Sequence, residues 1–264
     1  MRKYQQLLSM FITRYLTYRA RVFIWLFTDS AQYILFPFLW MAIFAQTAPP
    51  GGYSVKSLVT YYVIMAVVST GFVSHCSRHV RTEIQSGFLS RRLTVPFPYF
   101  NLILMAEFSY KCLSTIISAA ALILLYIFAY DYLIVPDSWL RWLAFLISIF
   151  FTFAISHLLE FLIGLATFWI GDTKSLSTIE EIVNAIFSGR LAPLLFLPPV
   201  LQSVAGVLPF KYLAFVPAEI FVGQIAMADI PRVLGIGLLW VVSLGTLIAI
   251  LWRRGLKNYD GFGM

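Results

Sequence analysis

Six long apolar runs, joined by short connections, constrain the fold of this chain more than any other feature. A helix that crosses the hydrocarbon core of a bilayer needs about 20 mostly apolar residues. Only 12% of the 264 residues are charged, whereas soluble globular domains average about 25%. The sequence therefore predicts an all-α integral membrane protein with six transmembrane helices, at residues 22–45, 57–76, 99–130, 139–170, 177–197 and 233–252.

The first 21 residues are amphipathic and basic. The apolar residues that recur there at helical spacing are Tyr4, Leu7, Leu8, Phe11, Ile12 and Tyr15. Lysines and arginines flank or oppose them, so the segment suits a helix that lies in the membrane interface with its cations at anionic headgroups. An ordinary solvated helix is the alternative. We predict an N-terminal interfacial helix over residues 1–21 and a six-span domain over residues 22–264.

The distribution of basic residues predicts the orientation. One side of the predicted spans carries Arg2, Lys3, Arg14, Arg19, Arg21, Arg78, Arg81, Arg91, Arg92, Lys174, Arg253, Arg254 and Lys257, and the other carries Lys56, Arg141, Lys211 and Arg232. Because cytoplasmic loops are enriched in Lys and Arg, we expect both termini to be cytoplasmic. The same bias accounts for the net charge of +7, so we expect no nucleic-acid partner.

Prolines interrupt the chain between the fifth and sixth predicted spans and leave apolar pieces too short to cross a membrane and return. A seventh full span would place the basic residues 253–257 outside, against the charge bias. We therefore interpret residues 198–230 as broken, re-entrant helices in the outer leaflet, where protein or a water-filled cavity must satisfy the backbone. They form a candidate outer gate that contains Pro198, Pro199, Pro209 and Pro217.

The loop between the second and third spans carries the most informative motif. Residues 81–93 suit a short helix with Ile84, Phe88 and Leu89 on one face, and the prolines at 96 and 98 end it. The loop resembles the first coupling helix of ABC-2 type permeases, in which a glycine and a leucine precede a basic stretch and Leu-x-x-Pro. The matching residues are Gly87, Leu89, Arg91, Arg92, Leu93 and Pro96.

Other stretches agree with this resemblance, which covers essentially the whole chain. Residues 188–223, with Gly189, Pro193, Pro209 and Pro217, are similar to the family's fifth span and outer re-entrant region. The two ends resemble a subgroup with paired permeases, through Tyr18-Arg19-Ala20 before Trp25 and through Trp252-Arg253-Arg254-Gly255-Leu256-Lys257.

The resemblance implies a permease subunit of an ATP-driven exporter in the bacterial inner membrane. Two permeases, identical or paralogous, would pair and bind two ATP-binding subunits, whose closure drives alternating access. It assigns ATPase coupling to Glu83, Ile84, Gly87, Phe88, Leu89, Arg91, Arg92 and Leu93, and a second contact to the loop with Asp172 and Lys174. ATP and Mg would bind the partner, because this chain has no Gly-x-x-x-x-Gly-Lys-Ser/Thr phosphate loop. A plain solvated loop is the alternative for residues 81–93.

Ionisable residues inside the predicted spans form a second group of candidates, because each is costly in hydrocarbon. They are Asp29, Glu107, Lys111, His157, Glu160 and Arg190. Glu107, Lys111, Glu160 and Arg190 fall at similar depth in the inner half of the membrane, and we predict that they form a buried polar network. Three interpretations stay open: a structural ion-pair network, a polar wall of the substrate path, or a proton relay through His157.

Two other classes of function compete with a permease subunit. A free-standing channel or lipid scramblase would show the same hydropathy pattern. A membrane-embedded enzyme is disfavoured, because the sequence has neither a His/Asp/Glu cluster with metal-ligand spacing nor a Ser/His/Asp set. We predict no catalytic residue and no metal site on this chain.

Overall fold

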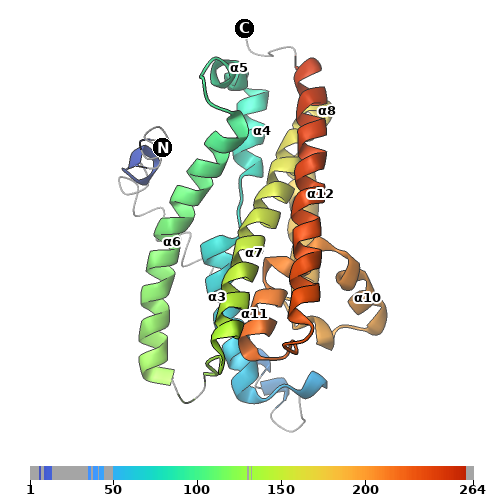
Figure 1. The fold of residues 1–264 in the computed structure, drawn as a ribbon. Helices are drawn as coiled ribbons and strands as arrows, with labels where there is room; N and C mark the ends of the chain where they lie inside the picture. Colours follow the sequence, from blue (N-terminus) through green and yellow to red (C-terminus); the bar gives the residue numbers. More distant parts are fainter. Residues whose placement is uncertain are drawn as a thin grey trace.

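The computed structural model describes residues 6, 9–13, 35–36, 38–40, 42–44, 50–129, 131 and 133–259. Every regular element among these residues is helical (Figure 1), which confirms the predicted all-α class. Residues 9–13 are helical, as are residues 35–36, 38–40 and 42–43. The rest of the predicted interfacial helix and of the first span, including Asp29, lies outside the described residues.

Four long helices run side by side along the molecule (Figure 1): α3 (Val55–Phe72), α6 (Tyr99–Ala129), α7 (Trp139–Leu165) and α12 (Ile230–Lys257). Helix α7 packs against α12, and α3 packs against α6. In the described part of the chain, three helical stretches are long and apolar enough to cross a membrane: Val55–Gln85, Trp139–Ile170 and Ile230–Lys257. They contain the second, fourth and sixth predicted spans. Helix α6 matches the bounds of the third to within one residue.

The second predicted span and the loop after it differ from the prediction. Helix α3 ends at Phe72, residues 73–76 are non-helical, and a new helix, α4 (Ser77–Gln85), follows. Gly87 then takes a φ of 73°, a left-handed conformation that ends one helix and turns the chain into α5 (Phe88–Leu93). The prediction of one helix over 81–93 is therefore wrong: two short helices meet at Gly87.

The fifth predicted span, 177–197, is also wrong in its bounds. Helix α9 covers only Lys174–Phe187, about 21 Å at 1.5 Å per residue, and the chain leaves it at Gly189 with a φ of 82°. A Cβ atom at Gly189 would lie 2.5 Å from the Tyr61 hydroxyl and 3.1 Å from Cβ of Phe215. The close approach of α3 and of Phe215 therefore requires glycine here and ends the helix early.

The proline-rich stretch forms short helical pieces, as predicted. They are η3 (Leu194–Phe196), α10 (Pro199–Val207), η4 (Pro209–Leu213) and α11 (Phe215–Val222). Pro199 and Pro209 open their helices, where a missing N–H costs nothing. Helix α11 packs against both α3 and α7, and Pro217 and Ile220 within it are buried. The remaining short elements are η1 (Pro50–Gly52) and α8 (Thr167–Ile170).

The two ends of the molecule carry different elements. Helices α4, α5 and α8 and the last turns of α12 lie at one end, at the top in Figure 1. The start of α3 and the connection from α6 to α7 lie at the opposite end. The helix ends that contain Arg91 and Arg254 therefore lie opposite the helix starts that contain Lys56 and Arg141.

Candidate coupling surface and intramembrane polar site

Helix α4 is seated tightly on α7. Gly164 of α7 faces Val80 of α4 so closely that a Cβ atom at Gly164 would lie 2.6 Å from Cβ of Val80. Val80, Ile84 and Leu89 are all buried. The sequence predicted that Ile84 and Leu89 face an ATPase. Because both are buried, they instead pack helices α4 and α5, together called the α4–α5 unit, against the rest of the protein.

Glu83 joins α4 to α5. Its carboxylate oxygen Oε1 accepts a hydrogen bond from Nε of Arg92 (3.0 Å) and forms an ion pair with Nη2 of the same residue (3.0 Å). The same oxygen lies 3.2 Å from Nε2 of His79. Because Glu83 is only 6% exposed, this ion pair is better shielded from solvent than a surface pair. The Glu83–Arg92 contact therefore connects α4 to α5 directly.

The outward face of α5 is apolar and basic. Phe88 and Leu93 are 39% and 43% exposed. The guanidinium groups of Arg91 and Arg92 lie 5.5 Å and 5.0 Å from the centre of the Phe88 ring, within cation–π distance, and hold the ring in place. A fixed aromatic ring beside arginines is the composition typical of interaction hot spots.

The second predicted contact loop lies beside α4. Nε2 of Gln85 donates a hydrogen bond to the carbonyl oxygen of Gly171 (2.7 Å), and Nε of Arg81 lies 3.8 Å from Oδ1 of Asp172. Asp172 also accepts the N–H of Lys174 at the start of α9. A recess of about 420 Å³ is lined by residues of α4 and α8 and by residues 258–259. The structure thus brings both predicted contact elements to one surface.

The break between α3 and α4 is surrounded by the ionisable residues that the sequence placed at one depth. On the carbonyl side, Nζ of Lys111 donates to the carbonyl oxygen of Thr70 (3.2 Å) and Oγ of Ser114 donates to the same oxygen (3.4 Å). Lys111 is 5% exposed. A buried cation at the last carbonyl groups of a helix complements its dipole.

Carboxylates lie on the other side of the break. The backbone N–H of Ser77 donates to Oε2 of Glu160 (3.0 Å), and the N–H of His75 donates to Oε2 of Glu107 (3.3 Å). Ser74 adds a hydroxyl donor to Glu107 at 2.9 Å. These side chains satisfy N–H groups that a helix start leaves without partners. Glu107, Lys111 and Glu160 therefore cap the two ends of a broken helix.

The fourth predicted residue, Arg190, belongs to the same electrostatic neighbourhood. Glu160 interacts with Glu107 and Glu180, and Glu180 interacts favourably with Arg190. The sequence patterns did not identify Glu180 or the exposed His75. The Ser74-His75 pair, which interrupts an apolar run, was the available sequence signal for the break between α3 and α4.

His157 occupies an aromatic environment. It is 1% exposed, its Nδ1 lies 3.2 Å from Oγ of Ser74, and its ring packs among Phe100, Phe153 and Phe161 at centroid distances of 5.3, 6.0 and 6.2 Å. Among the described residues, Nε2 of His157 has no hydrogen-bond partner. A proton relay needs polar groups on both sides of the ring, so this geometry favours the structural interpretation.

The candidate outer gate is held by polar contacts at the opposite end. The Tyr53 hydroxyl donates a hydrogen bond to the buried carboxylate of Glu219. Nη1 of Arg141 donates to the carbonyl oxygens of Ile220 (3.2 Å) and Ile225 (3.1 Å) and so caps α11. Of the four predicted prolines, Pro209 and Pro217 are buried, whereas Pro198 and Pro199 are exposed.

Comparison with known proteins identifies the family. A family model described as ABC-2 family transporter protein matches residues 31–263. Searches of curated proteins and of solved structures found no match. The family match spans residues 81–93, the broken helix and the proline-rich region, and it confirms the resemblance to ABC-2 type permeases. The chain is therefore a multi-pass membrane protein that belongs to the ABC-2 transporter family.

Proposed function

We propose that this chain is the permease subunit of an ATP-driven exporter in the bacterial inner membrane, and that separate ATP-binding subunits hydrolyse ATP. Two such subunits, with their ATP and Mg, would bind a pair of permeases, identical or paralogous. The observation that carries the proposal is the α4–α5 unit, which presents Phe88 and basic side chains at one end and is internally fixed by Glu83 and Arg92. Family membership supports the same role.

The break at 73–76 supports a mechanism. Because α4 is fixed to α5 by the Glu83–Arg92 pair and separated from α3 by non-helical backbone, a displacement of α5 can tilt α4 without bending α3. The same displacement reaches α7 through the contact between Val80 and Gly164. Helices α3 and α7 both pack against α11. Closure of the ATP-binding subunits would thus be transmitted toward the outer gate and produce alternating access.

The proposed topology has six spans, with cytoplasmic termini and a re-entrant outer region at residues 198–222. The fifth span would cross in two pieces, α9 and the irregular segment that follows it. Irregular backbone at membrane depth needs internal hydrogen-bond partners. Tyr61 donates to the carbonyl oxygen of Gly189 (2.9 Å), and Tyr62 (3.1 Å) and Trp40 (3.2 Å) donate to that of Leu191. These hydrogen bonds satisfy carbonyl groups of the irregular segment after α9, so this segment can lie within the membrane.

Cysteine labelling tests this topology. In a background without Cys76 and Cys112, single cysteines at the exposed positions Val135 and Ser203 should react with an impermeant thiol reagent in intact cells. A cysteine at the exposed position Ser86 should react only after lysis, since α4 faces the cytoplasm in the proposed orientation. Labelling of the Ser86 position from outside would contradict the orientation, and protection of the Ser203 position in intact cells would contradict an accessible outer region.

Purification of the chain from its native membrane tests the function. A permease should bring an ATP-binding subunit with it in roughly one-to-one ratio, and the complex should hydrolyse ATP in lipid vesicles. A channel or scramblase would purify alone and move its substrate without ATP. An enzyme would turn over a substrate without either partner. Recovery of the chain alone, with passive flux through it, would contradict the proposal.

A further inference from the structure

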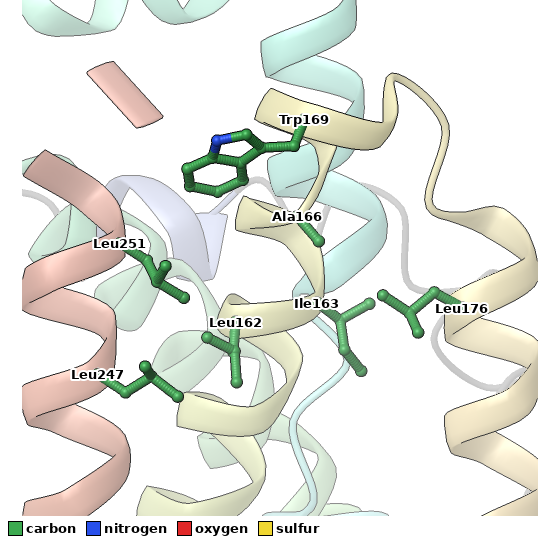
Figure 2. Close-up of a pocket in the computed structure, with 7 residues that line it drawn as sticks. All are labelled: Leu162, Ile163, Ala166, Trp169, Leu176, Leu247 and Leu251. Carbon is green, nitrogen blue, oxygen red and sulfur yellow. The ribbon is translucent and has the colours of Figure 1, made fainter. Parts of the chain in front are cut away.

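An apolar groove lies along the end of α7, between α9 and α12 (Figure 2). Leu247 and Leu251 of α12 lie on one side and Leu176 of α9 on the other, and Trp169 of α8 lies across one end. The groove has a volume of about 350 Å³. Of the described side chains that line it, only Trp169 carries a polar atom. The groove therefore suits a hydrocarbon chain, and it is too small for a whole lipid or for a helix.

A cation lies beyond one end of the groove. Leu247, Leu251 and Arg254 occupy positions i, i+4 and i+7 of α12, so they share one face of the helix. Arg254 is exposed, and in the described part of the chain it forms no ion pair. Asp172, the acidic residue of the α8–α9 turn, forms contacts with Arg81 and with the N–H of Lys174.

We propose that this groove binds one acyl chain of an anionic phospholipid, and that Arg254 binds the phosphate of its headgroup. Along α12, the apolar groove is followed by an exposed cation, which matches the order of acyl chain and headgroup in a lipid. Trp169 lies where an interfacial aromatic side chain is expected. In the proposed topology the lipid belongs to the cytoplasmic leaflet, where anionic headgroups attract basic residues.

Quenching of tryptophan fluorescence by brominated lipids tests the site, because bromine quenches only nearby indole rings. The full chain is reconstituted in phosphatidylcholine vesicles that contain increasing fractions of phosphatidylglycerol with dibrominated acyl chains. We expect a quenching component that saturates at a low fraction of this lipid and is absent from Trp169→Phe. The same brominated chains on phosphatidylcholine should need about a fivefold higher fraction, as expected for the loss of one lipid–arginine attraction.

Two variants and a control test the contribution of Arg254 separately from that of the groove. Arg254→Gln should raise the half-saturating fraction of phosphatidylglycerol about fivefold. Arg253→Gln, at the neighbouring exposed arginine on another face of α12, should leave it unchanged and serves as the matched control. Ala166→Phe, which fills the groove, should remove the component that depends on Trp169 for both lipids.

Two results would overturn the proposal. Equal quenching by both lipids, unaffected by Arg254→Gln, would mean that only ordinary surrounding lipid contacts Trp169. An absence of Trp169-dependent quenching would mean that protein fills the groove. The measurement uses neither ATP nor a partner, and the vesicles carry the probe in both leaflets, so its outcome is independent of the proposed transport function and orientation.

Discussion

Replacement of Glu160 by alanine is expected to destabilise the protein by about 1 to 3 kcal/mol, the range found when a buried hydrogen-bond donor loses its acceptor. Glu160 is 8% exposed and accepts the backbone N–H of Ser77 at the start of α4. Without the carboxylate, that N–H stays buried with no acceptor. Thermal unfolding in detergent should shift downward by on the order of 5 °C.

Two further variants isolate the cause. Glu181→Ala removes an exposed carboxylate from α9 and should change the stability by less than about 0.5 kcal/mol. Glu160→Gln retains an oxygen that can accept the N–H of Ser77, so it should lose less than Glu160→Ala. If Glu160→Ala melts no lower than Glu181→Ala, then Glu160 does not cap α4, and the break at 73–76 is stabilised in another way.

The long spans could be predicted from the sequence because their cause is local. Residues 99–130 and 139–170 are mostly apolar, and the structure forms helices with nearly these bounds. The ends of α3 and α9 could not be predicted in this way. The groups that stabilise the break after α3, Lys111 and Glu160 among them, come from distant helices. Likewise, Tyr61 and Phe215 determine where α9 ends.

The candidate site shows the same division. The sequence placed Glu107, Lys111 and Glu160 at one depth, but the Ser74-His75 pair was its one signal that the ends of a broken helix lie between them. In the motif at residues 81–93, the pattern predicted helix and singled out Gly87, but it placed this glycine inside a single helix. It could not show that Ile84 and Leu89 are buried while Phe88 stays exposed, because residues on one predicted helix face are divided between two helices that meet at Gly87.

Phe88→Asp is expected to cause the largest functional loss. Phe88 is the exposed aromatic residue of the α4–α5 unit, and an aromatic hot spot contributes at least about 2 kcal/mol to binding, or roughly 30-fold in affinity. The permease itself should stay folded, since an aspartate at the first position of α5 is compatible with a helix start and lies near Arg91 and Arg92. Val135→Asp, at a 51% exposed residue of the opposite end, is the matched control.

The most direct measurement is the affinity of the co-purifying ATP-binding subunit for the reconstituted wild-type chain, for Phe88→Asp and for Val135→Asp. If α4–α5 is the surface that receives the movement of the ATPase, Phe88→Asp should bind at least about 30-fold more weakly. Val135→Asp should bind like the wild type. Wild-type affinity for Phe88→Asp, with unchanged ATP hydrolysis in the complex, would contradict the assignment of α4–α5 as the coupling element.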